Sequence, residues 1–162
     1  MAILFSSCWS YWDDYRVESA YRPVLMLRSD LESSIKVQEP KSIEKYGKIY
    51  RKDSLLFINE PYEGIHIYDN SDHQNPENLG FINIPGNIDI AMKGDILYAD
   101  NAVDLVTMRL NADHSITILD RNRDVFPESS PPDGEWYYFE GENQRPENSV
   151  IVKWVEKWKR YS

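Results

Sequence analysis

The sequence predicts an all-β protein made of two propeller-blade-like, four-stranded antiparallel meanders, a partial and non-closed propeller, with one short helix near the N-terminus. Three observations predict this fold: a repeat with a period near 40 residues, short strands separated by turn residues, and the lack of a sustained helical period. The chain also contains 5 Trp and 11 Tyr, and such aromatic richness suits tightly packed sheet faces.

The repeat is visible in two matched pairs of strands. Residues 54–59 are echoed 41 positions later by residues 95–100, and residues 64–68 are echoed 40 positions later by residues 104–108. The strands before and after these pairs also correspond, at residues 48–51, 79–84, 88–93 and 115–120. We therefore expect four strands in each copy, with the copies at about residues 46–86 and 87–126.

Turn residues separate these strands. Asp, Asn, Gly and Pro concentrate in the connections, at residues 52–53, 61–64, 70–78, 93–95, 101–102 and 111–114. Short strands with such brief connections form an antiparallel meander, which is the blade of a propeller.

Two blades cannot close a ring, because propellers typically have about four to eight blades and each blade buries its faces against neighbours. Three solutions are open: flanking segments complete a compact core, several chains assemble, or the chain is part of a larger parent. We favour the first. A strand is expected at about residues 149–155, after a long connection rich in Pro, Gly and Glu, and residues 21–27 form another extended segment. Flanking strands near Val24 and Val152, or another chain, would then complete the blades.

One short helix is expected between residues 21–27 and the first copy. Ser29 and Glu32 have the spacing of a capping box, in which Ser29 caps the helix and Glu32 reaches back to the cap. The helix is predicted from about Asp30 to Ile35.

The first copy contains the motifs of a known repeat: GIHIYD at residues 64–69, SD at 71–72, NP at 75–76 and IPG at 84–86. They resemble the LVIVD-type β-propeller repeat of bacterial surface proteins. The longer segment that also includes residues 82–91 and 97–100 resembles a group of Bacteroidetes lipoproteins that carry this repeat and have no assigned activity. The resemblance covers about residues 45–127. It departs at His73, where the turn Pro would stand, and at residues 107–109, where the aliphatic strand would end in Asp.

The N-terminal residues 3–8, ILFSSC, resemble the lipobox of a lipoprotein signal peptide, with apolar and then small residues before a cysteine. Phe5 stands three positions before Cys8, and the basic n-region and most of the apolar h-region are missing. An ordinary cysteine near a terminus is the alternative. Together with the repeat, the resemblance implies lipid attachment at Cys8 and a location in the cell envelope, at the outer membrane of a Gram-negative bacterium. Residues 1–20 are then a lipobox-like segment and tether, and residues 21–162 a single β-rich domain.

Composition excludes several classes of protein. The net charge of -9 disfavours binding to nucleic acid, since the expected basic patch is missing. The longest uncharged stretch, residues 1–12, is too short to span a bilayer. A single cysteine excludes an intramolecular disulfide.

Catalytic and cofactor motifs are missing from the sequence. It contains no Gly-x-Ser-x-Gly elbow and no glycine-rich nucleotide loop. His66 lies within an apolar strand and is expected to be a structural, hydrogen-bonded histidine, while His73 and His114 lie in turns. We therefore expect no enzymatic activity, no cofactor and no metal.

Two acidic clusters are the candidate contacts for a ligand or ion: Asp69 with Asp72, and Asp100 with Asp104. A calcium loop beginning at Asp69 would need Gly at its sixth position and Glu at its twelfth, where Gln74 and Gly80 stand. Turn chemistry is therefore the preferred explanation of the first cluster.

The expected function is that of a non-catalytic envelope lipoprotein, a binding or scaffolding module held at the membrane through Cys8, with a protein or a glycan as its ligand. Two alternatives stay open. One is a carboxylate-based hydrolase or carbohydrate-active protein that uses Asp100 and Asp104. The other is a self-assembling repeat protein, in which copies of the chain associate.

Overall fold

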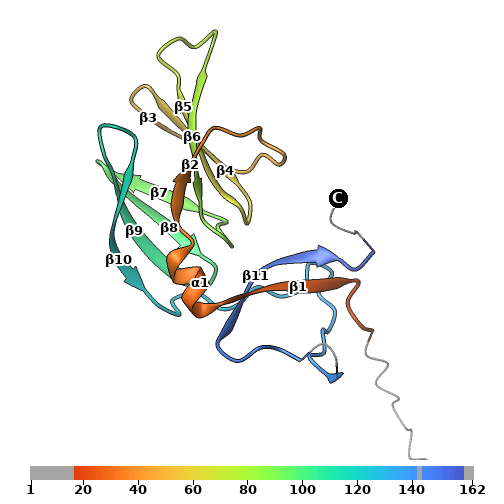
Figure 1. Cartoon of the computed structure of the whole chain (residues 1–162). Coiled ribbons are helices and arrows are strands. Elements are labelled where there is room, and N and C mark those ends of the chain that lie inside the picture. The colour runs from red at the N-terminus through yellow and green to blue at the C-terminus, as the bar shows by residue number, and fades with distance from the viewer. Residues whose placement is uncertain (1–16, 142–143, 159–162) are drawn as a thin grey trace, which may run out of the picture.

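The computed structural model describes residues 17–141 and 144–158, so Cys8 and its lipobox-like segment lie outside the described residues. The described chain has eleven strands, arranged in three antiparallel sheets, and one short helix near its N-terminal end (Figure 1). No sheet among these residues closes into a barrel. The predicted fold class, all-β with two open meanders and one short helix, is confirmed. No helix in the described part of the chain is long and apolar enough to cross a membrane.

The first blade is the meander of β3 (Ile49–Lys52), β4 (Leu55–Glu60), β5 (Gly64–Asp69) and β6 (Glu77–Asn83). A fifth strand, β2 (Lys36–Gln38), pairs with the free edge of β6. The sequence did not predict β2. Its three residues are all exposed and carry no apolar alternation, so only the pairing with β6 makes them a strand.

The second blade is the meander of β7 (Ile90–Lys93), β8 (Ile96–Asn101), β9 (Asp104–Leu110) and β10 (Ile116–Asn122). It has four strands, and β10 forms its free edge. The pairing of β9 with β10 shifts register between Ile118 and Asp120, so this blade is bulged at its edge.

The core lies between the two blades, where they pack face to face. The first blade contributes apolar side chains that include Phe57, Ile65 and Ile67, and the second contributes Leu97 and Met108, all almost fully buried. Along each strand these residues alternate with others on the opposite face, as a pleated strand requires.

The blades stack in the same orientation. Phe57 and Ile65 face the second blade, yet their repeat equivalents, Tyr98 and Leu105, lie on the far side of the second blade. We call this far side the open face. The opposite side of the first blade, which carries His66 and Phe81, is called the outer face. Successive blades of a propeller are related in this way, because each turns the same face toward the next blade in the chain.

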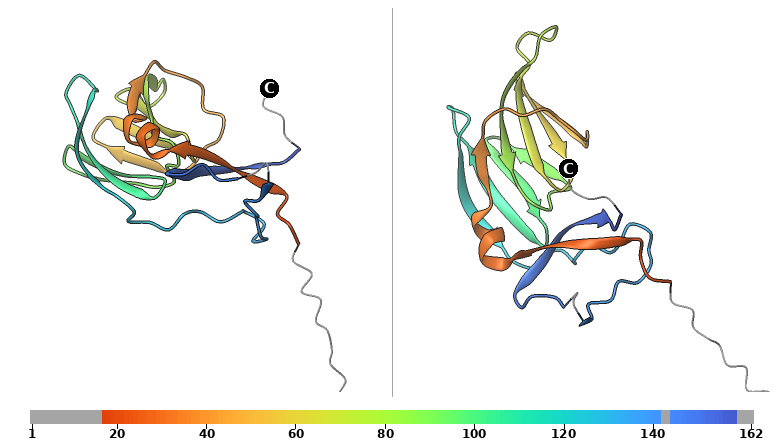
Figure 2. Two further views of the ribbon diagram at one scale, coloured as in Figure 1. Left: turned by 60° about the horizontal axis from the view of Figure 1, so that its bottom comes forward. Right: turned by 45° about the vertical axis from the view of Figure 1, so that its right-hand side comes forward.

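The flanking strands form a third, two-stranded sheet. The strand β1 (Tyr21–Leu27) pairs antiparallel with β11 (Ser149–Glu156), as Figures 1 and 2 show. Together with Leu31, which follows β1, and the β8–β9 turn of the second blade, they form a second apolar cluster. Its buried members are Leu31, Val103, Val150 and Val152, and Val24, Met26 and Ala102 pack against it. Flanking strands near Val24 and Val152 therefore pack against the second blade.

The helix α1 (Arg28–Ser33) begins two residues earlier than predicted, and the predicted cap was wrong. Leu27 occupies the N-cap position without a capping side chain, and Ser29 lies inside the first turn. Tertiary contacts fix the start instead. The Arg28 amide donates to the carbonyl of Asn148 at 2.7 Å, and Leu31 is fully buried.

Candidate functional site

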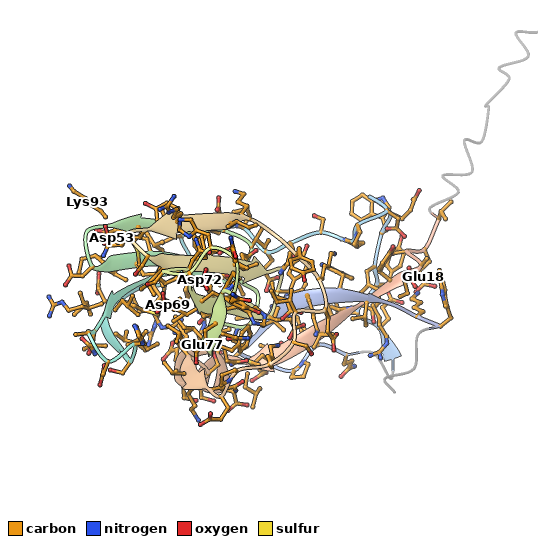
Figure 3. The ribbon with its side chains drawn as sticks, turned by 90° about the horizontal axis from the view of Figure 1, so that it is seen from above. Glu18, Asp53, Asp69, Asp72, Glu77 and Lys93 are labelled. Atoms are coloured by element: carbon orange, nitrogen blue, oxygen red, sulfur yellow. The ribbon has the colours of Figure 1, made fainter. Side chains whose placement is uncertain are left out.

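The first predicted cluster, Asp69 and Asp72, lies in the loop that follows β5. The carboxylate of Asp69 accepts the amide and hydroxyl of Ser71 at 2.8 and 2.6 Å. The carboxylate of Asp72 accepts the Gln74 amide at 2.9 Å and the Asn75 side chain at 3.0 Å. Figure 3 shows both acids among the blades, away from Glu18 beside the flanking strands. These bonds are those of a local turn, and the described residues contain no group of three side chains suited to hold a metal ion.

Asp104, from the second predicted cluster, is fully buried at the start of β9. Its carboxylate accepts hydrogen bonds from Arg28 at 2.6 Å, from Arg121 at 2.7 Å and from the amide of Asp124 at 3.1 Å. Burial alone would raise the pKa of Asp104, but the two guanidinium groups outweigh it and hold the pKa below its ordinary value. Asp104, on β9, thus ties α1 to the second blade and fixes β10 beside it.

Asp100, near the end of β8, is bound differently. Its Oδ1 accepts the side-chain amide of Asn87 at 2.8 Å and the backbone amides of Ile88 and Asp89 at 2.9 Å. Its Oδ2 accepts only the Ile88 amide among the described residues, at 3.0 Å. Burial is the main cause that raises the pKa of Asp100, against the opposing effect of the backbone amides.

Asp100 lines a small cavity where the turns of both blades, β11 and the connection after β10 meet. We call it the seam cavity. Its volume is about 190 Å³. The lining comprises Tyr62, Gly86, Ile88, Asp89, Asp100, Ala102, Phe126, Pro127, Ser129, Ile151 and Val152. The walls are mainly apolar, and Asp89, Asp100 and Ser129 supply the polar side chains other than the Tyr62 hydroxyl. Asp104 does not line this cavity, so the two acids of the second predicted cluster, Asp100 and Asp104, do not belong to one site.

The backbone around the seam cavity adopts unusual conformations. Tyr62 and Ala102, which occupy equivalent turns of the two blades, have φ angles of 71° and 57°. Gly86 has a φ of 77°, and a side chain there would lie 2.8 Å from the backbone of Ala102. Non-glycine residues rarely adopt this left-handed region, and such conformations cluster at functional sites.

A chain of buried amides joins the first blade to this cavity. The side chain of Asn59, fully buried, donates to Asn87 Oδ1 at 2.5 Å, and Asn87 in turn donates to Asp100. Sequence reasoning missed Asn87 and Tyr62. The repeat offered one signal for this contact, because Asn59 and Asp100 occupy equivalent positions in the two copies. Each of them forms a hydrogen bond with the side chain of Asn87, which lies in the connection between the blades.

His66 lies on the outer face of the first blade, away from the seam cavity. It is fully buried, with its Nε2 2.8 Å from Glu60 Oε2. Glu60 also contacts Lys41 at 3.2 Å and accepts the Glu44 amide at 2.9 Å. Burial would raise the pKa of Glu60, but the hydrogen bond with His66 and the Glu44 amide lower it. His66 therefore belongs to a buried polar contact that fixes residues 41–45 over the outer face.

Comparison of the chain with protein-family models, with curated proteins and with solved structures finds no match. The seam cavity is the place where a partly open, mainly apolar space, a half-buried carboxylate of raised pKa and left-handed backbone coincide. These are the properties by which a binding site is recognised from its physical chemistry.

Proposed function

We propose that this protein is a non-catalytic binding module of the bacterial cell envelope and that its ligand enters the seam cavity. The observation that carries the proposal is the convergence of both blade turns, β11 and the connection after β10 on one apolar space that contains Asp100. A rigid sheet framework that positions loops around a cavity is the usual construction of a binding site.

The geometry favours binding over hydrolysis by Asp100 and Asp104. Such hydrolysis needs two carboxylates on either side of one bond. Asp104 is fully buried and bound by two guanidinium groups, whereas Asp100 lines the seam cavity and accepts backbone amides. Of these two acids, Asp100 lines the cavity and Asp104 does not, so Asp104 does not supply the second carboxylate that such a reaction requires.

The size and chemistry of the cavity indicate its ligand. Typical small-molecule pockets measure about 300–1,000 Å³, so a volume of about 190 Å³ suits a single side chain or ring. Ile88 and Phe126, 46% and 39% exposed, lie at its rim and offer apolar contact. Asp100 Oδ2 has spare acceptor capacity, so we expect an apolar group that carries a hydrogen-bond donor, such as an aromatic side chain of a protein ligand.

The compound p-cresol, the side-chain analogue of tyrosine, tests this site. We expect saturable changes in the amide NMR signals of Tyr62, Ile88 and Asp100 on its addition. The variant Ile88→Asp should weaken binding at least about tenfold, since it places a charge at the apolar rim. Ile118→Asp is the matched control, because Ile118 is similarly exposed, at 44%, but lies on β10. Unchanged signals at these residues, or equal binding by both variants, would contradict the site.

The envelope part of the proposal rests on the LVIVD-type resemblance and the sequence around Cys8. We propose that Cys8 is acylated and that the lipid holds the module at the outer membrane, where its ligand is a protein or a glycan. Labelling of cells with a palmitate analogue, followed by fractionation, should place the label and the protein in the membrane fraction, and Cys8→Ala should remove both. Unlipidated native protein in the cytosol would refute this location.

A further inference from the structure

The open face of the second blade is the repeat equivalent of a surface that is already buried. In the first blade, Phe57 and Ile65 pack against the second blade and are fully buried. Their equivalents Tyr98 and Leu105 are only half-buried, and Ala91 beside them is exposed. The open face thus has the residue pattern of a blade interface without an occupant from the described residues.

The side chains of the open face form three rows across β7, β8 and β9. Direct cross-strand partners place Ala91, Tyr98 and Thr107 in the middle row. The row toward the β7–β8 turn contains Lys93, Ile96 and Arg109. The row toward the seam contains Asp100 and Leu105, with Asp89 just before β7 at its end. One outer row is therefore basic and the other acidic.

A shallow hollow of about 230 Å³ lies on this face beside Tyr98, and it is bordered by Ala91, Leu105 and Phe126. An apolar centre with a charged rim is the composition of a protein interface. The charges of the two outer rows indicate which partner would bind the open face. A two-fold axis along the middle row would set Lys93 of each copy opposite Asp89 of the other, and the two rows of Tyr98 against each other. Such self-complementarity is what an isologous dimer requires.

Head-to-tail stacking of copies is obstructed at the other end of the molecule. A ring would need the outer face of the first blade to receive an open face. Residues 41–45 lie over that outer face: Lys41 stands 3.8 Å above the ring of Phe81, and the amides of Glu44 and Lys45 donate to Glu60. Figure 1 draws the loop between β2 and β3 on the side of the first blade away from the second. Among the described residues, a loop covers the outer face, whereas the open face keeps the hollow beside Tyr98 that Phe126 borders.

We propose that two copies of this chain associate through their open faces, with Lys93 of each copy opposite Asp89 of the other and Tyr98 at the centre. The existing ion pairs of the rim, Lys48 with Asp89 and Arg109 with Asp95, are solvent-exposed and of little energetic value, so they do not oppose the exchange. This interface adjoins the seam cavity, with which it shares Asp89, Asp100 and Phe126.

Sedimentation velocity of the purified chain, in reducing buffer so that Cys8 forms no disulfide, tests the proposal. As the concentration rises, we expect the mass to shift from 19.1 kDa to twice that value. Tyr98→Asp should keep the chain monomeric at every concentration. Tyr46→Asp, at a residue that is 70% exposed on another surface, is the matched control and should dimerise like the unaltered chain.

Charge reversal makes the test specific to the two-fold arrangement. Lys93→Glu alone and Asp89→Lys alone should each weaken the dimer at least about tenfold, because each places like charges opposite each other twice. An equimolar mixture of the two variants should restore the dimer, since both contacts in the mixed pair are again between opposite charges. Circular dichroism checks that each variant is folded. A monomer at all concentrations, a Tyr98→Asp dimer, or a mixture no stronger than its components would overturn the proposal.

Discussion

The two blades have the same meander but different surroundings. The first blade is covered on both faces, by the second blade and by residues 41–45, and it gains the extra edge strand β2. The second blade is covered on one face and keeps an open face on the other. Equivalent positions therefore have different burial: Phe57 is fully buried, whereas Tyr98 is half-exposed. A repeat defines strands, but neighbours define which of their faces are core.

The buried polar contacts show the same lesson. In each blade one cross-strand pair next to the turn contains a buried acid, Glu60 opposite Gly64 in the first and Asp104 opposite Asn101 in the second. In the first blade the acid lies on the first strand of the pair, β4, whereas in the second blade it lies on the second strand, β9. Its partners also differ, since Glu60 binds His66 and a loop whereas Asp104 binds two arginines.

Removing the acid of the second blade should have the largest effect. Asp104→Ala leaves the guanidinium groups of Arg28 and Arg121 without their shared partner in a buried place. Loss of one member of a buried ion pair costs about 3–5 kcal/mol, so we expect a loss of this size in urea unfolding. Asp95→Ala is the control, because Asp95 makes only an exposed pair with Arg109 and should change stability by less than about 0.5 kcal/mol. Equal effects of the two variants would contradict the role of Asp104.

Truncation of the equivalent aromatic residues should separate the two blades. Phe57→Ala should cost about 3–5 kcal/mol, since it opens a cavity in the shared core. Tyr98→Ala should cost only about 1 kcal/mol, because the ring is half-exposed on the open face. Urea unfolding at low protein concentration measures both values without a contribution from self-association. A similar loss for the two variants would show that the open face is covered in solution.

The pH dependence of stability should have opposite signs for the two acids of the second blade. The pKa of Asp104 is lowered in the fold from 3.8, so its stabilisation is complete above the unfolded pKa and is lost as the pH falls through the folded pKa. The pKa of Asp100 is raised, so the folded chain binds this proton first, and acidification toward 3.8 relieves a cost of burial. The first acid makes the fold acid-sensitive, and the second partly offsets this.

Two substitutions measure these slopes. In urea unfolding at a series of pH values below about 6, Asp104→Asn should flatten the acid loss of stability relative to the unaltered chain, and Asp100→Asn should steepen it. The comparison uses the slope against pH, because both substitutions also change the stability at neutral pH. Slopes that change in the same direction would refute the opposite shifts in pKa.

The hairpin turns before β4 and β8 should show the smallest difference. Asp53 and Gly94 occupy equivalent positions with φ angles of 52° and 62°. Gly94→Ala should cost about 1 kcal/mol from left-handed backbone strain alone, since no atom lies within 4 Å of the added group. Asp53→Gly should stabilise the first blade by a few tenths of a kcal/mol by removing the same strain. Thermal unfolding resolves both, and a stabilising Gly94→Ala would contradict the assigned conformation.

Local patterns were enough to predict most strands and the turn chemistry at Asp69 and Asp72, because alternation and turn residues act over a few positions. They were not enough for β2 or for the start of α1. Those two depend on Ile82 and Asn148, which are distant in sequence from the residues they fix. The seam cavity was missed for the same reason, since Tyr62, Phe126 and Ile151 meet only in the folded chain.

The sequence by itself determined that this protein has two equivalent meanders, because each strand and turn is encoded by its own residues. Only the tertiary structure decided what differs between them: which face of each blade is covered, where the buried acids find their partners, and that Asp100 lines a cavity while Asp104 does not. The physical reason is that burial, desolvation and pKa depend on atoms brought close by the fold, and these come from segments far apart in the chain.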